Sequence, residues 1–172
     1  MQNMWGDSVL TYISTVFLFT KARKSIQYEV KRYPTVETGG ILMGVPLSNG
    51  NFLVTHATSA GPNAIRKPNT FKKDWCYTLN VLDYLAKRYS VIYLGEWHSH
   101  TSNGKPSFKD IIAMKRVAYK NKAPLLLLIV SGDGEKSFYL VSPSFIKPEI
   151  KQLLWVEVNN TKDIYSKYQV VA

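Results

Sequence analysis

Several features that would point to secretion or to a membrane are scarce in this chain. Cys76 is the only cysteine among 172 residues, so no disulfide can form within the chain and an oxidising compartment gains no support. The apolar stretch at 9–19 is interrupted by hydroxyl-bearing residues, is too short to span a bilayer and follows no basic segment. We therefore expect a cytoplasmic protein without a membrane segment, and we interpret Cys76 as a small buried hydrophobe.

Acidic residues are also few, with 12 Asp and Glu against 22 Lys and Arg, which gives a net charge of +10. Such a balance favours an acidic protein, an anionic surface or nucleic acid as partner. The basic residues are scattered along the chain, without a long basic tail or an RNA-binding signature. A solvated surface is the simpler interpretation, and we do not expect nucleic acid as the partner.

Repeats, low-complexity tracts and Pro/Ser-rich linkers are missing as well. The chain is 45% hydrophobic and 13% aromatic, which is sufficient for one packed core at this length. We therefore expect residues 1–172 to form a single domain.

The hydrophobic pattern alternates between helical and strand periods. Helices are expected at 21–33, 73–88 and 107–121, the second with Leu79, Leu82 and Leu85 on its apolar face. Strands are expected at 9–19, 41–45, 52–54, 91–97, 125–130 and 137–141, with Asn49-Gly50 as a two-residue hairpin turn. The uninterrupted apolar run 125–130 is typical of a central strand covered on both faces. This order predicts an α/β fold with a largely antiparallel sheet flanked by helices.

Histidine is rare too, but two of the three histidines stand together in Gly95-Glu96-Trp97-His98-Ser99-His100. If the preceding strand continues, His98 and His100 point to the same side, because strand side chains alternate between faces. Asp110, in the first turn of the next helix, can then supply a hard oxygen ligand. Two imidazoles, one carboxylate and an open position for water are the arrangement of a catalytic zinc site.

Each of these residues also has a simpler explanation on its own. Ser107-x-x-Asp110 before an apolar periodic run is a capping box, in which each side chain serves the other residue's backbone N–H. His98 and His100 alone could be partly buried, hydrogen-bonded histidines, which is how we interpret His56. Capping and packing do not readily explain the combination of a strand-end histidine pair with a serine and a carboxylate opening the next helix.

The set Glu37, His98-Ser99-His100, Ser107 and Asp110 resembles the JAMM signature of the JAB/MPN metalloprotease family, and the strand that follows Glu37 belongs to the same likeness. The resemblance implies a cytidine-deaminase-like sandwich and a Zn²⁺ ion held by His98, His100 and Asp110. It also implies a general base at Glu37 and an oxyanion hydrogen bond from Ser107. The family pattern gives Glu96 no catalytic role, so we interpret it as a neighbour of the site.

The chain departs from the family pattern in one loop. Thr101 replaces the usual proline after the second histidine, and six residues, 101–106, precede Ser107 where seven are usual. We expect metal binding to survive, because the ligands on both sides of the loop remain, and the position of Ser107 to be the more sensitive point.

Within the family, the segments around His98 and around residues 57–64 and 71–74 resemble prokaryotic JAB peptidases of CBASS-like anti-phage operons. That resemblance implies cleavage after the C-terminal tail of a ubiquitin-like protein, or release of a conjugated target of an E1/E2-like system. Three alternatives stay open: processing of a sulfur-carrier protein, a non-catalytic MPN scaffold, and a RadC-like DNA-associated protein.

Overall fold

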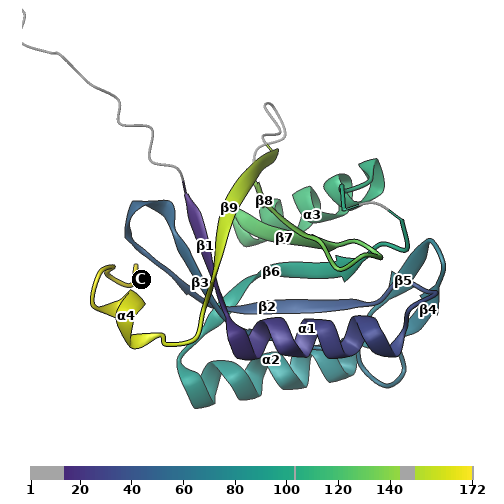
Figure 1. Cartoon of the computed structure of the whole chain (residues 1–172), viewed down its shortest axis with the longest axis horizontal. Coiled ribbons are helices and arrows are strands. Elements are labelled where there is room, and N and C mark those ends of the chain that lie inside the picture. The colour runs from purple at the N-terminus through teal and green to yellow at the C-terminus, as the bar shows by residue number, and fades with distance from the viewer. Residues whose placement is uncertain (1–13, 103, 144–149, 172) are drawn as a thin grey trace, which may run out of the picture.

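Seven strands close into one barrel in the computed structural model, which describes residues 14–102, 104–143 and 150–171. The barrel strands are β1 (Thr15–Phe19), β2 (Gly39–Pro46), β3 (Phe52–Ala57), β6 (Ile92–Ser99), β7 (Leu125–Val130), β8 (Lys136–Val141) and β9 (Ile150–Val158). Their order around the barrel is β1-β3-β2-β6-β7-β8-β9 (Figure 1). The short strands β4 (Ile65–Lys67) and β5 (Thr70–Lys72) form a separate hairpin.

The sheet is mixed, as the sequence predicts. The pairs β2–β3, β2–β6, β7–β8 and β8–β9 are antiparallel, whereas β6–β7, β1–β3 and β1–β9 are parallel. The β1–β9 pair joins the two ends of the described chain and closes the barrel, a step that the sequence pattern does not predict. Antiparallel pairs still predominate, which confirms the expected α/β class.

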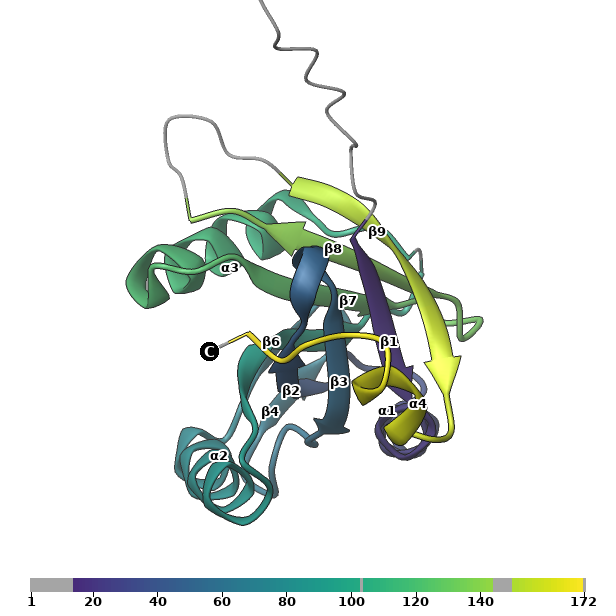
Figure 2. The same ribbon diagram turned by 90° about the vertical axis from the view of Figure 1, so that its left-hand side faces the viewer.

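Helices cover the sheet from two sides. They are α1 (Thr20–Arg32), α2 (Trp75–Tyr89), α3 (Phe108–Asn121) and the short α4 (Lys162–Tyr165). The helices α2 and α3 lie on one side of the sheet, where α2 packs against Ile41 and Met43 of β2 and α3 packs against β7 and β8. Helix α1 lies on the opposite side, in the cluster that includes Leu42 of β2 (Figures 1 and 2). The three long helices were predicted to within two residues at either end.

Strand β7 is the centre of the core. All of its residues are buried, because one set packs in the cluster that includes Ile26 of α1 and the alternate set packs against Met114 of α3. This burial confirms the expectation for the uninterrupted apolar run. The strand next to it, β6, is thereby fixed from both sides, with β2 as its other neighbour.

Some local predictions are wrong. Leu79 is 59% exposed, because the buried side of α2 runs through Thr78 and Leu85, and Leu79 lies one helical step around from it. Cys76 is exposed as well, in the first turn of the same helix. The turn at Asn49-Gly50 is longer than a two-residue hairpin: its residues lie in a 3₁₀ turn, Ser48–Gly50, closed by Leu47 N–H donating to Asn51 O at 2.8 Å.

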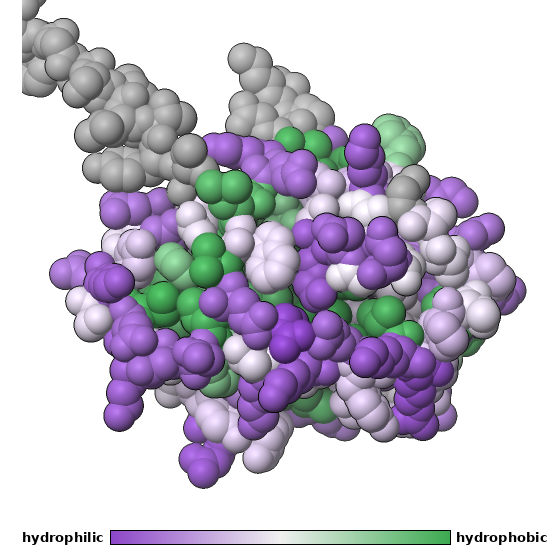
Figure 3. All heavy atoms as spheres, in the orientation of Figure 1, coloured by the Kyte–Doolittle hydropathy of each residue, from purple (hydrophilic) through white to green (hydrophobic). Residues whose placement is uncertain are grey.

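The described part of the first expected strand is β1, Thr15–Phe19, and positions 9–13 of that prediction lie outside the described residues. In the described part of the chain, no helix combines the length and apolar character needed to cross a bilayer. Hydrophilic side chains cover most of the face seen in Figure 3, with small apolar patches between them, as expected for a solvated surface.

Candidate active site

His98 and His100 lie at the end of β6 and point to one side of the sheet. Their Nε2 atoms are 3.0 Å apart. Ser99 between them points the other way: its N–H donates to Thr38 O at 2.8 Å, and its Oγ accepts from Thr38 N at 3.1 Å. These two bonds hold the histidine strand in register with the segment that carries Glu37.

Asp110 reaches both histidines from the start of α3. Its Oδ1 lies 3.3 Å from His98 Nε2, and its Oδ2 lies 3.2 Å from His100 Nε2. The same carboxylate accepts from Ser107 N at 2.6 Å, and Ser107 Oγ accepts from Asp110 N at 3.3 Å. The capping box and the ligand-like placement are therefore both present, and the cap aims the carboxylate at the histidines.

The charge of Asp110 suits this position. Burial alone would raise the pKa of its carboxyl group, but the hydrogen bonds from His100 and His98 outweigh burial and hold the pKa well below its usual range. The group is therefore anionic at any ordinary working pH, which is the state in which a carboxylate binds a metal ion.

The three side chains match the geometry of a metal site. One ligand atom from each lies within 4.8 Å of the others. The two Nε2 atoms are 3.0 Å apart, and they lie 3.3 and 3.2 Å from the two Asp110 oxygens, Oδ1 and Oδ2. Donor atoms bound tetrahedrally at zinc-like bond lengths of about 2.0–2.1 Å lie about 3.3–3.4 Å apart, close to these values. Two nitrogens and one carboxylate oxygen, with room for a further ligand, can hold one divalent metal ion.

Glu37 stands just before β2 and lines the same cleft as the histidines. Burial raises the pKa of its carboxyl group, although the nearby His100 and His98 act in the opposite direction. Its N–H donates to Lys67 O of β4 at 2.9 Å. Its side chain is thus a partly buried carboxyl group of raised basicity, which suits a proton acceptor.

All five residues singled out in the sequence line one cleft of about 1150 Å³: Glu37, His98, His100, Ser107 and Asp110. The shortened loop does not keep Ser107 and Asp110 from the histidines, and its residue 103 lies outside the described part of the chain. Exposed apolar side chains from three elements line the cleft as well: Ile65 of β4, Trp75 of α2 and Phe108 of α3.

Phe71 and Gly39 also shape the cleft and were not foreseen. The ring of Phe71, on β5, lies 5.9 Å from the ring of His98. A Cβ on Gly39 would stand 2.5 Å from Phe71 Cζ and 2.3 Å from Trp97 O, so only glycine lets these three segments meet. The Gly39-Gly40 pair was a visible sequence signal for such a close approach.

Glu96 lines the cleft but does not join the histidine cluster. Its Oε2 pairs with Lys73 Nζ at 2.5 Å, and its Oε1 accepts from Tyr93 OH at 3.3 Å. The expectation that Glu96 is a neighbour of the site is consistent with these contacts.

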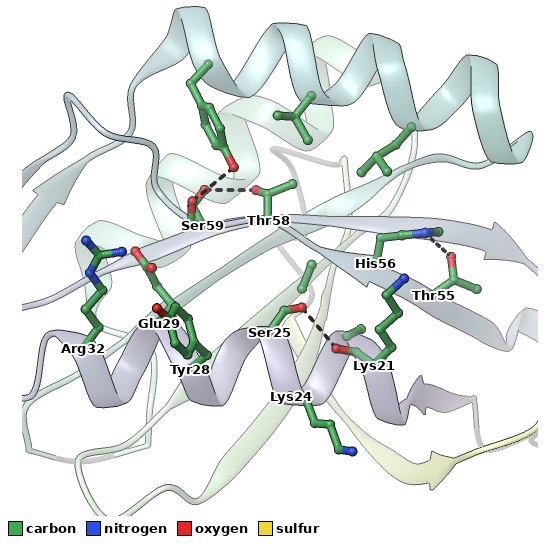
Figure 4. Close-up of a pocket in the computed structure, with 15 residues that line it drawn as sticks. Lys21, Lys24, Ser25, Tyr28, Glu29, Arg32, Thr55, His56, Thr58 and Ser59 are labelled. Atoms are coloured by element: carbon green, nitrogen blue, oxygen red, sulfur yellow. Dashed lines mark hydrogen bonds between the residues drawn. The ribbon is translucent and has the colours of Figure 1, made fainter.

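His56 lies in a different hollow, between α1 and α2 (Figure 4). Its Nδ1 is hydrogen-bonded to Thr55 Oγ1 at 2.9 Å, and its ring packs 4.7 Å from the ring of Tyr89. The prediction of a partly buried, hydrogen-bonded histidine is confirmed.

Comparison with known proteins identifies the family to which this geometry belongs. Residues 20–141 match the prokaryotic homologs of the JAB domain. The chain is a member of this prokaryotic JAB family. Membership confirms the resemblance to JAB/MPN proteins that the spacing of Glu37, the histidine pair and Asp110 indicates.

Two relatives carry names that point to proteolysis. A CD-NTase/cGAS isopeptidase from Escherichia coli is 29% identical over 131 residues, which cover 73% of this chain and 78% of that protein. The probable metalloprotease y4qB of Sinorhizobium fredii is 26% identical over 112 residues, covering 60% of this chain and 68% of that protein. Similarity to these JAB proteins supports a peptidase function.

A solved structure agrees with the fold. The solution structure of a protein from Desulfitobacterium hafniense superimposes with a TM-score of 0.63 at 19% identity, over 84% of this chain and 94% of that one. At this identity the likeness supports the fold alone.

Proposed function

We propose that this JAB protein is a zinc-dependent peptidase or isopeptidase, with His98, His100 and Asp110 as the metal ligands. The observation that carries the proposal is the convergence of these three side chains with Glu37 in one cleft. A non-catalytic scaffold would be expected to lack one or more of these groups. We also propose that residues 1–172 form one domain, which the single barrel in the described part of the chain supports.

Each side chain has a distinct task in the proposed reaction. Zinc at this site supplies Lewis acidity, which polarises a peptide carbonyl and makes water a competent nucleophile near neutral pH. Glu37 accepts a proton from the attacking water as the new C–O bond forms, and passes that proton to the amine as the C–N bond breaks. The raised pKa of Glu37 makes its carboxylate a stronger acceptor for the proton of the attacking water.

Ser107 is the proposed oxyanion donor. Its Oγ accepts the N–H of Asp110, so the hydroxyl hydrogen can point into the cleft. A donor held in place before the reaction is worth about 10²–10³ in rate for a developing oxyanion. The cap on α3 thus positions two functional side chains, Ser107 itself and Asp110.

The proposed substrate is the bond that follows the C-terminal tail of a ubiquitin-like protein, either in a precursor or in a conjugate made by an E1/E2-like system. The likeness to a relative named CD-NTase/cGAS isopeptidase supports a conjugated protein target. A role in anti-phage defence belongs to the same proposal. The described part of β5 pairs with β4 alone and lines the cleft, so an extended tail can add to its free edge.

The decisive assay measures cleavage of a panel of ubiquitin-like proteins, each fused through its C-terminal tail to a reporter protein. The proposal expects cleavage at the end of the tail for at least one fusion, about one zinc per chain by elemental analysis, and loss of activity with a chelator. Restoration by added zinc completes the expected result. No cleavage of any fusion by fully zinc-loaded protein, or cleavage unaffected by the chelator, would overturn it.

A further inference from the structure

An almost buried arginine, Arg66, links β4 to α1 and to the segment next to Glu37. The Nη2 atom of Arg66, on β4, donates to Glu29 Oε1 of α1 at 2.9 Å and to Gly61 O at 3.2 Å. Its Nε donates to Thr38 Oγ1 at 3.1 Å, and its guanidinium stacks 4.0 Å from the ring of Tyr33. The side chains of Arg66 and Glu29 are only 10% and 6% exposed.

The hydroxyl group of Thr38 closes the arrangement. It donates to Glu29 Oε1 at 2.8 Å while it accepts from Arg66, so carboxylate, hydroxyl and guanidinium are joined in a triangle. Figure 4 shows Glu29 on α1 beside Arg32, but its ion-pair partner is Arg66. Removing two charges from water costs free energy, so a buried ion pair often adds little net stability to the fold. The Arg66–Glu29 pair is therefore better explained by a role other than stability.

The triangle holds the chain on both sides of Glu37. Thr38, which follows Glu37, is bonded through its side chain to Glu29 and Arg66 and through its backbone to Ser99. Glu37 itself donates its N–H to Lys67 O, and Lys67 follows Arg66 on β4. Two of the contacts that fix the backbone at Glu37, the bond from its N–H to Lys67 O and the side-chain bond of Thr38 to Arg66, therefore depend on where Arg66 is held, in addition to the bonds between Thr38 and Ser99.

We propose that Arg66, Glu29 and Thr38 are positioning residues that hold the Glu37 carboxylate at the catalytic distance from the zinc site. The expected change in kcat rests on the proposed function, whereas the expected change at the Glu37 backbone rests on the geometry alone. A displacement of about 1 Å at a reacting group can cost on the order of 10² in rate, so a small loss of anchoring is measurable.

Thr38 offers a matched pair of variants. Thr38→Val keeps the shape of the side chain and removes the hydroxyl, whereas Thr38→Ser keeps the hydroxyl and removes a methyl group. The proposal expects kcat for a cleaved fusion to fall by at least tenfold in Thr38→Val, with KM and zinc content unchanged, and to stay within about twofold of wild type in Thr38→Ser. A purely structural role would lower the unfolding temperature of either variant without separating their kcat values.

Arg66 provides a readout that does not need activity. Hydrogen exchange at the Glu37 amide, measured by NMR on the full chain, should speed up in Arg66→Met and in Thr38→Val, because the bond to Lys67 O loses its anchor. Arg23→Met is the control, since it removes an ion pair with Glu157 that is 2.7 Å long and partly exposed, away from the cleft. It should leave both the Glu37 amide and kcat unchanged.

The outcomes separate the two proposals. Faster exchange at Glu37 in a protein that cleaves no fusion would retain the positioning role and overturn the peptidase. Unchanged exchange at Glu37 in both Thr38→Val and Arg66→Met would overturn the positioning role, even in an active enzyme. Equal kcat values for Thr38→Val and Thr38→Ser in an active enzyme would overturn it as well.

Discussion

Asp110 Oδ2 lies 3.2 Å from His100 Nε2 and at the same time accepts the backbone N–H of Ser107. One carboxylate thus closes the first turn of α3 and faces the histidine pair at the end of β6. A helix cap and a metal ligand are usually treated as alternative explanations of an aspartate. Here the cap fixes the rotamer that the proposed metal site requires.

Replacing Asp110 should separate metal binding from capping. Asp110→Asn removes the anionic ligand, and the loss of zinc affinity should exceed the roughly 10–100-fold that follows loss of an outer hydrogen-bond partner. Ser107→Ala is the control: it removes the cap oxygen, costs about 1 kcal/mol of stability and keeps the zinc. Isothermal titration with zinc and thermal unfolding measure the two effects. Equal zinc affinity in Asp110→Asn and wild type would contradict the ligand assignment.

The raised pKa of Glu37 predicts a gain in stability on mutation. Burial makes the folded chain hold this proton more tightly than the unfolded chain does. The stabilising contribution of this group is therefore fully present below its pKa in the unfolded chain. It is lost as the pH rises through its higher pKa in the folded chain, so at pH 7 none of it remains. In the presence of chelator, Glu37→Gln should raise the unfolding temperature at pH 7, and the difference should vanish below about pH 4. A variant that is less stable than wild type at pH 7 would argue against a buried, strained carboxylate.

The close approach at Gly39 predicts a strong effect of one methyl group. Gly39→Ala would place a Cβ 2.3 Å from Trp97 O, and such overpacking costs about 1–3 kcal/mol. Gly104→Ala is the matched control, because its Cβ would meet Ser131 Cβ at an ordinary 3.5 Å. Denaturant unfolding measures the free energy of unfolding of both variants. Equal losses of stability would show that the close contact at Gly39 does not exclude a larger side chain.

Phe108 is expected to contact substrate rather than the fold. It is 78% exposed beside Ser107 and lines the cleft. Phe108→Ala should raise KM for a cleaved fusion severalfold with little change in unfolding temperature, since little packing is lost. Leu154→Ala, at a 61% exposed position on β9, should change neither quantity. A KM that is identical for Phe108→Ala and wild type would remove Phe108 from the substrate surface.

The features of the site that the sequence predicts are those that depend on the repeat of a single strand or helix. The alternation of a strand brings His98 and His100 to one side, and the spacing of a capping box puts Asp110 in the first turn of α3. The apolar run of β7 likewise predicts its own burial. Each of these features depends on neighbours only a few residues away.

The parts that escaped prediction depend on partners distant in the chain. Closure of the barrel rests on parallel pairing between β1 and β9, and β9 has only one fully buried residue, so its pattern carries little signal. The hairpin that bears Arg66 consists of three-residue strands with no period to detect. The pairing of Arg66 with Glu29 becomes visible only once α1 and β4 are placed side by side.

The most direct test of the proposed chemistry compares wild type and Glu37→Gln, each loaded with zinc, on the same ubiquitin-like fusion. Glu37 lines the cleft, but no metal-ligand role is proposed for it, so the variant should hold about one zinc per chain and keep KM near that of wild type. Its kcat should fall by about 10²-fold or more, since no side chain accepts the proton of the attacking water. Full cleavage by the zinc-loaded variant would contradict the role of Glu37, and loss of its zinc would contradict the assignment of His98, His100 and Asp110 as the complete set of protein ligands.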